Sequence, residues 1–206
     1  MSEFELNYRT DLAIPIAPIA SVAERTEWAR SRAQEFITAS TLVAGAADRI
    51  EAALADLAGK ADDDSMIALL VSEDASVLAP LTIYTTAQSM SDREVARFLS
   101  TPATLLPPTG QTTQTQHLGV GFSSTLLESS DEVNYSTRRW VFFGESSTVT
   151  ALLGPVIPAQ AIVLVEPIAE VILEASRAVD FEPAQDPHRV TRLLAMTEKV
   201  GDKWEI

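Results

Sequence analysis

Hydrophobic and polar positions are most clearly patterned between residues 138 and 179. Two short apolar runs, Trp140–Phe143 and Ala161–Val165, are bounded by glycine and proline, which is typical of strands buried on both faces. Residues 148–153 begin with polar and apolar positions in alternation, which predicts a strand with one face toward water at its start. From Pro167 the period becomes helical, with apolar residues at positions 168, 171, 172, 175 and 179. The pattern predicts a core sheet and a helix that covers it.

Two further helical patterns precede this stretch. Ser21 followed by Glu24 forms a capping-box motif, which predicts a helix from Val22 to about Ala39. A second pattern covers about Val43 to Ala58, and Gly59 is placed to end it in the left-handed conformation. The apolar stripe drifts between the two patterns, so we expect a break near residues 40–45. In the first helix the inward stripe is expected to contain Val22, Ala29, Ala33, Phe36 and Ile37.

The remaining elements are read as strands and one short helix. An opening strand or hairpin is expected within residues 3–16, and a buried strand at Met66–Val71. Residues 77–85 form another strand pattern, in which Pro80 indicates an edge position or a bulge. Residues 100–116 are rich in proline, threonine and glutamine, which indicates either a mobile loop or an exposed hairpin. A second capping box predicts a helix after Ser91, and successive strands are expected at residues 118–127 and 135–143.

Together these elements predict an α+β fold, a largely antiparallel sheet of five to seven strands with helices packed on its faces. Residues 1–182 are expected to form a single α+β domain, with a helical layer at 22–58 and the sheet and its covering helix at 66–180. Prolines 183 and 187 separate this domain from residues 183–206, which we expect to be a C-terminal appendage docked on the same protein or on a partner.

Composition and charge narrow the function. The 206 residues include no cysteine, which excludes zinc–thiolate sites, iron–sulfur clusters, disulfides and thiol nucleophiles. The formal net charge is −14, and the acidic excess is spread over both halves of the chain. Such a field repels phosphate backbones and anionic lipids, so neither nucleic acid nor a membrane is an expected partner. With no signal-like start and no long apolar run, a cytoplasmic location is expected.

The sequence contains no recognised catalytic or metal-binding motif. It has no glycine-rich phosphate loop, and residues 121–125 lack the second glycine of a nucleophile elbow. The two histidines, His117 and His188, are far apart in sequence. Residues 62–64 are three consecutive aspartates, which could ligate a cation but lack the spacing of a calcium loop, so a solvated turn is preferred. No cofactor or metal is therefore expected, and an enzymatic role is not favoured.

Arginine and tryptophan positions supply the candidate contact residues. Arg138 should share a sheet face with Trp140, where it could bind an anion, contact the ring or balance nearby acids. Trp28 falls beside the apolar stripe of its helix, so it either packs along the helix flank or anchors a partner. Glu166, Glu170 and Glu174 are expected to follow one solvated helix face. The partner-contact candidates are Trp28, Tyr135, Arg138, Trp140 and Trp204.

The chain shows an early strand, a helical layer, several mostly antiparallel strands and a final strand-to-helix unit ending in Ile172 to Phe181. This order resembles the PsbP-like α/β/α sandwich, and the resemblance covers residues 60–182. The resemblance implies a partner-binding or assembly protein without catalytic residues, and it carries over no site residue. Two features depart from that family. Its bacterial members are often lipoproteins, whereas this chain has no cysteine, and the helices at 22–58 are longer than the family needs.

Three hypotheses follow. The leading one is a non-enzymatic interaction or assembly subunit, such as an adaptor, a chaperone-like protein or an immunity-type protein, that binds a protein partner. The first alternative is a small-molecule enzyme or ligand-binding domain with a site near His117 and Arg138. The second is a structural homodimer formed through the helices at 22–58.

Overall fold

The fold is built on an antiparallel sheet of seven strands in the order β2-β3-β4-β8-β7-β6-β5. It was described from a computed structural model, which covers residues 4–5, 8–40, 44–101, 104–184, 186 and 188–193. The sheet confirms the α+β class and a strand number within the expected range. Its strands are β2 (Ala13–Ile16), β3 (Ser65–Val71), β4 (Leu78–Thr86), β5 (Thr109–Thr115), β6 (Gly119–Ser130), β7 (Val133–Phe143) and β8 (Thr148–Val156).

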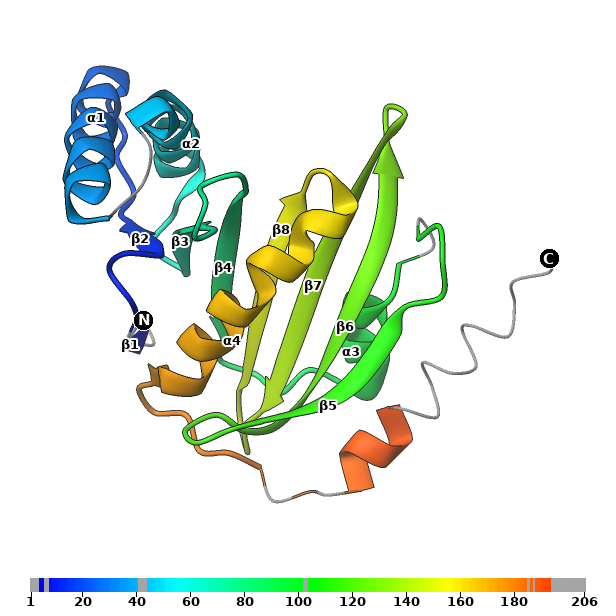
Figure 1. The fold of residues 1–206 in the computed structure, drawn as a ribbon. Coiled ribbons are helices and arrows are strands. Elements are labelled where there is room, and N and C mark those ends of the chain that lie inside the picture. Colours follow the sequence, from blue (N-terminus) through cyan, green and yellow to red (C-terminus); the bar gives the residue numbers. More distant parts are fainter. Residues whose placement is uncertain are drawn as a thin grey trace.

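Helices cover both faces of this sheet (Figure 1). Helix α4 (Glu166–Ala175) crosses one face, where it packs against a cluster that includes Trp140 and Phe142 of β7. The neighbouring β7 residues Val141 and Phe143 point to the opposite face and pack against α3 (Asp92–Leu99). This division follows from the pleat of a strand, because successive side chains point to opposite faces. The sheet therefore separates two hydrophobic clusters.

Helices α1 (Val22–Ala39) and α2 (Ala47–Lys60) form a third cluster with β2 and β3. The predicted first helix is confirmed, and the expected break is present because α1 ends at Ala39 and a 3₁₀ turn, η1 (Ala44–Ala46), precedes α2. Two details were wrong. Val22 was expected in the inward stripe, but it is the first residue of α1 and is 69% exposed. Gly59 lies inside α2, which continues to Lys60 and is followed by an extended Ala61.

Strand β4 is an interior strand, with β3 on one side and β8 on the other. Of the edge position or bulge expected at Pro80, the structure shows a local edge, although β4 as a whole is not an edge strand. Pro80 pairs with Leu69 of β3, but pairing with β8 ends at Leu81 opposite Leu153. The proline lies one position beyond the last pair with β8, so its missing N–H is tolerated because the site is locally an edge.

Two hairpins complete the far side of the sheet. Strands β6 and β7 are joined by Asp131 and Glu132, which both have positive φ. Strand β5 pairs with β6 from Thr109 opposite Thr125 to Thr115 opposite Gly119. Of the two interpretations of residues 100–116, the exposed hairpin is confirmed for β5, whose side chains are mostly exposed.

The apolar run Ala161–Val165 is not a strand, which corrects the sequence interpretation. It belongs to the 3₁₀ helix η2 (Ala159–Leu164), which leads directly into α4. Ala161, Ile162 and Val165 are buried, whereas Val163 is 64% and Leu164 47% exposed. The expected strand, buried on both faces, would have buried every residue of the run, and a half-buried strand would have buried alternate ones. Burial of residues 161, 162 and 165 fits a helical turn instead. After α4, strand β9 (Arg177–Ala178) pairs with β1 (Phe4–Glu5) in a second, two-stranded sheet.

The described part of the expected C-terminal appendage packs against the domain. Residues 188–193 are helical, and Val190 and Leu193 join the cluster on the α3 face. Arg189 lies over the ring of Phe143, 4.3 Å from its centroid, and binds Asp92 with Nε 3.0 Å from Oδ1. Deletion of residues 183–206 would therefore remove part of a hydrophobic core. No helix within the described residues is long and apolar enough to span a bilayer.

Candidate functional site

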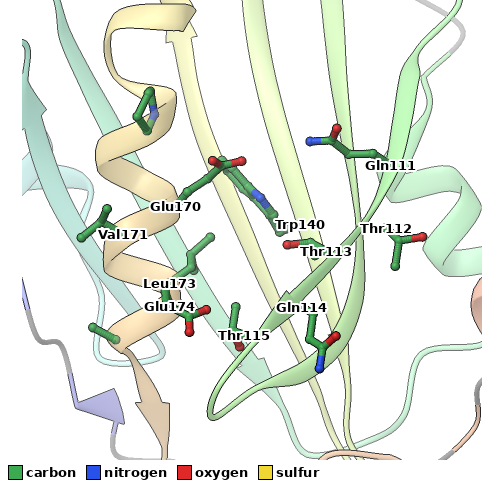
Figure 2. A pocket seen from close by; sticks show the side chains of 12 residues that line it. Gln111, Thr112, Thr113, Gln114, Thr115, Trp140, Glu170, Val171, Leu173 and Glu174 are labelled. Atoms are coloured by element: carbon green, nitrogen blue, oxygen red, sulfur yellow. The ribbon is translucent and has the colours of Figure 1, made fainter.

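A groove of about 650 Å³ lies between helix α4 and strand β5, and we call it the α4–β5 groove. Figure 2 shows the helix on one side of the groove and the strand on the other. The helix contributes Pro167, Glu170, Val171, Leu173, Glu174 and Ala175. The strand contributes Gln111, Thr112, Thr113, Gln114 and Thr115, and Trp140 of β7 lies between the two walls.

The groove follows the free edge of strand β5. Every residue from Gln111 to Thr115 lines it, although neighbouring strand residues point to opposite faces. A groove that lay over one face would contact only alternate residues. Within the described residues, β5 pairs with β6 alone, so its outer backbone N–H and C=O groups have no strand partner. The groove therefore offers main-chain hydrogen-bonding groups beside a helix.

Trp140 forms the floor of the groove and is 1% exposed. In the view of Figure 2 its indole appears between the carboxylate of Glu170 and the side chain of Thr113. No hydrogen bond from the indole nitrogen is found among the described residues. Buried indole N–H groups usually have an acceptor, so this donor is available to a ligand in the groove.

An ion-pair cluster lies beside the floor and fixes the helix. Arg138 of β7 is buried, and its Nη1 lies 3.0 Å from Oε1 of Glu166 while its Nη2 lies 3.4 Å from Oε1 of Glu170. The guanidinium carbon is also 5.3 Å from the centroid of the Trp140 ring. Burial raises the pKa of the Glu166 carboxyl above its ordinary value, Arg138 opposes that shift, and Glu170 adds to it. The cluster therefore has two carboxylates for one guanidinium.

The groove lining is acidic. Glu170 and Glu174 are exposed along it, and the lining contains no lysine, arginine or histidine. Within the described residues Glu174 makes no ion pair, whereas Glu170 shares Arg138 with Glu166. A positively charged group is therefore the electrostatic complement of this wall.

The outer side of α4 and η2 is unusually apolar for a surface helix. Val171 of α4 is 56% exposed, and Val163 and Leu164 of η2 are also exposed. Val171 borders both the α4–β5 groove and a smaller apolar pocket of about 130 Å³ on the other side of the helix. Exposed apolar residues gathered on one element favour contact with another molecule.

Two of the five predicted contact residues are buried. Trp140 and Arg138 are buried, so neither is available as an exposed partner contact, although Trp140 reaches the groove. Arg138 does share a face and a ring contact with Trp140, and it balances acids, but on an interior strand and not at the sheet edge. Trp28 and Tyr135 are half-buried, and Trp28 packs on the α1–α2 cluster. Trp204 lies outside the described residues.

The structure does not bring His117 and Arg138 together. His117 lies in the turn before β6 begins at Gly119, whereas Arg138 pairs with Thr125 in the middle of that strand. No group of three or more histidine, aspartate or glutamate residues in the described ranges could hold a metal ion. Asp62 instead accepts hydrogen bonds from the backbone N–H of Asp64 and the hydroxyl of Ser65, as expected for a turn.

Two features of the groove were missed from the sequence. The acids Glu166, Glu170 and Glu174 were expected on a solvated face, but Glu166 and Glu170 turn toward Arg138 because α4 buries Ala169, Ile172 and Leu173. The polar strand Gln111–Thr115 was recognised as a possible hairpin but not as a binding edge. Its threonine content, with neither lysine nor proline, was the available signal.

Comparison with known proteins adds no further constraint. No family model, no curated protein and no solved structure matches the chain, and the resemblance to PsbP-like sandwiches stays a prediction.

Proposed function

We propose that this protein is a non-enzymatic interaction subunit that binds an extended segment of a protein partner in the α4–β5 groove. The observation that carries the proposal is a sheet edge that has no strand partner among the described residues and lies along a groove whose other wall is a helix. An adaptor, chaperone-like or immunity-type role would each use such a site. The cytoplasmic location expected from the sequence is part of the same proposal.

Addition of a strand to a free edge is a common mode of peptide recognition. The main-chain hydrogen bonds supply affinity, and pockets for alternate side chains supply specificity. In the α4–β5 groove the edge of β5 would supply the main-chain hydrogen bonds. The helix residues Glu170, Val171 and Glu174 would contact the side chains of the bound segment. A segment of similar length to β5 would match the available edge.

Strand β5 lacks three common protections against such pairing. Edge strands are commonly blocked by lysine, by proline or by bulges. The sequence Thr109–Thr115 contains neither lysine nor proline, and its register with β6 is continuous. An unprotected edge that is also polar favours a specific binding role over general aggregation, since aggregation-prone segments combine high β-propensity with hydrophobicity.

The volume of the groove favours one alternative, a small-molecule ligand. Ligand pockets of proteins commonly measure about 300–1,000 Å³, so a cavity of this size could hold one. A small ligand would contact Trp140 and the helix without pairing along the strand. The hypothesis of a homodimer through residues 22–58 has less support, because the apolar stripes of α1 and α2 are already buried against β2 and β3.

Peptides selected on the intact protein test whether binding uses the free edge of β5. Random displayed peptides of about ten residues, the upper end of usual strand lengths, are selected on the immobilised protein. Binding is then measured by calorimetry with Thr112→Pro and Thr113→Pro. Neighbouring strand residues direct their N–H groups to opposite edges, so one variant loses a bond to β6 and the other loses only a free donor.

The proline variant with the smaller loss of stability is the one that lacks only a free N–H, and the proposal requires that it also loses peptide binding. The NMR signals of backbone amides that shift on binding should centre on residues 111–115 and 170–175. Selected peptides that bind equally to both variants would show that the edge is not used. The ligand alternative would be favoured if small molecules from a fragment screen bound without a peptide and shifted the NMR signals of Trp140 but not those of β5.

A further inference from the structure

We infer that the segment bound in the α4–β5 groove carries a basic side chain, which Glu170 and Glu174 receive above the indole of Trp140. This inference rests on the proposed function and adds the chemistry of the partner. The occupant of the groove is an extended segment of another protein that carries lysine or arginine.

The charged residues that line the groove are acidic. Glu170 and Glu174 are one helical turn apart, so their carboxylates follow the same side of α4 along the groove. The lining has no basic residue to neutralise them. Arg138 reaches Glu170 at 3.4 Å but lies closer to Glu166, at 3.0 Å. One buried guanidinium against two carboxylates, with Glu174 in addition, leaves the wall negative at neutral pH.

Trp140 adds a hydrogen-bond donor to the groove, a feature that does not depend on charge. Its side chain is 1% exposed and packs in the cluster between the sheet and the helix, and it also lines the groove. Its N–H has no acceptor among the described residues and is not one of the completely enclosed polar atoms without a partner. Such a donor needs a carbonyl or similar oxygen. The backbone of a bound peptide supplies carbonyl groups, and the same residue could then place its side chain toward the acids on the helix.

The acidic wall and the indole donor together favour a basic peptide over a free cation or a small carboxylate. A metal ion would gain nothing from an N–H donor, and a carboxylic acid would be repelled by Glu170 and Glu174. A basic residue within a peptide satisfies the acidic wall, the indole donor and the free strand edge together. A cationic segment is also attracted over distance by a chain whose net charge is −14.

The experiment compares matched charge removals. A fluorescein-labelled peptide from the selection is titrated with wild type, with Glu174→Gln, with Glu170→Gln/Glu174→Gln, and with Glu27→Gln/Asp63→Asn. The last variant removes two exposed acids far from the groove in sequence, on α1 and in the turn before β3. Glu174→Gln serves as the variant that leaves the Arg138 cluster intact. Thermal unfolding of each variant reports whether it is folded.

We expect selected peptides to be enriched in lysine or arginine. The groove double variant should then lose about tenfold or more in affinity, while the distant double variant changes by less than about twofold. Replacing the basic residue of the peptide by norleucine should give a similar loss on wild type and little further loss on the groove variant. This non-additivity would identify the two groups as contacting partners.

The contrary outcomes separate this inference from the proposed function. Peptides that depend on the β5 edge but lack basic residues, or that bind Glu170→Gln/Glu174→Gln normally, would overturn the inference and leave the function standing. An equal loss in the distant variant would show attraction by net charge alone and would also overturn it. Absence of any peptide sensitive to the proline variants would reject both.

Discussion

The Nη1 atom of Arg138 lies 3.0 Å from Oε1 of Glu166, and this ion pair joins the middle of strand β7 to the first residue of helix α4. Arg138 also donates hydrogen bonds to the hydroxyls of Thr125 at 2.7 Å and Ser123 at 3.2 Å on β6. One buried side chain therefore connects two strands and the helix. Since α4 forms a wall of the α4–β5 groove, the pair also holds the groove in shape.

Replacement of Arg138 by methionine should destabilise the protein by about 3 kcal/mol, because it leaves Glu166 largely buried without its cation. Urea unfolding at neutral pH measures the loss. The exposed pair Arg32–Glu35 is the matched control, and Arg32→Met should cost less than about 0.5 kcal/mol. The double variant Arg138→Met/Glu166→Leu should recover much of the loss, since apolar pairs can replace buried ion pairs. Equal losses for Arg138→Met and Arg32→Met would contradict the assigned role.

Gly121 is required by the close approach of β6 and β7. A Cβ at this position would overlap the carbonyl oxygen of Val141 and lie 2.8 Å from Cδ1 of Phe142. Gly121→Ala should therefore cost about 2 kcal/mol, as expected for overpacking a core. Gly45 is the control, because a Cβ there has nothing within 4 Å, and Gly45→Ala should be neutral or gain about 0.5 kcal/mol. Thermal unfolding of the two variants compares them, and a similar Tm shift in both would refute the argument.

Local signals predicted much of the fold. Ser21 and the stripe through Ala29, Ala33 and Phe36 predicted helix α1 with its observed bounds, and the Ser91–Glu94 capping box is present at the start of α3. These succeeded because caps and stripes depend on residues within a few positions of one another. The run Ala161–Val165 failed for the complementary reason, since a short aliphatic run suits a buried strand and a buried helix equally.

The groove was harder to predict because it depends on contacts between distant segments. Strand β5 becomes a binding edge only because it pairs at the end of the sheet, and its own sequence does not fix that position. The side of α4 that faces the sheet is set by the buried Val165 before it, so Ala169, Ile172 and Leu173 point inward. The sequence pattern correctly included Ile172, and Ile168 packs at the margin of the cluster, but Val171 was expected inward and is 56% exposed.

The turn between β6 and β7 carries avoidable strain. Asp131 and Glu132 have φ values of 49° and 66°, and non-glycine residues in this left-handed region cost about 1–2 kcal/mol each relative to the right-handed one. Glu132→Gly should stabilise the protein by about 0.5–1 kcal/mol, because glycine at this position gives a favoured two-residue hairpin turn. Asn134→Gly in the adjacent strand is the control and should destabilise by a similar amount. If urea unfolding shows both variants to be destabilised, the turn is not strained.

The pH dependence of stability shows whether burial or Arg138 has the larger effect on the pKa of Glu166. Burial raises the pKa of its carboxyl from 4.5, while Arg138 lowers it, and burial is the larger cause. Just above pH 4.5 the unfolded chain has then released this proton while the folded chain still holds it, so rising pH removes stability. Below that window the protonated folded form is favoured. Glu166→Gln lacks this titration, so its stability relative to wild type should increase as the pH rises through the window, and urea unfolding from pH 4 to pH 7 measures the difference. A carbon NMR titration of Glu166 with a midpoint below 4.5 would instead show that the guanidinium of Arg138 outweighs burial.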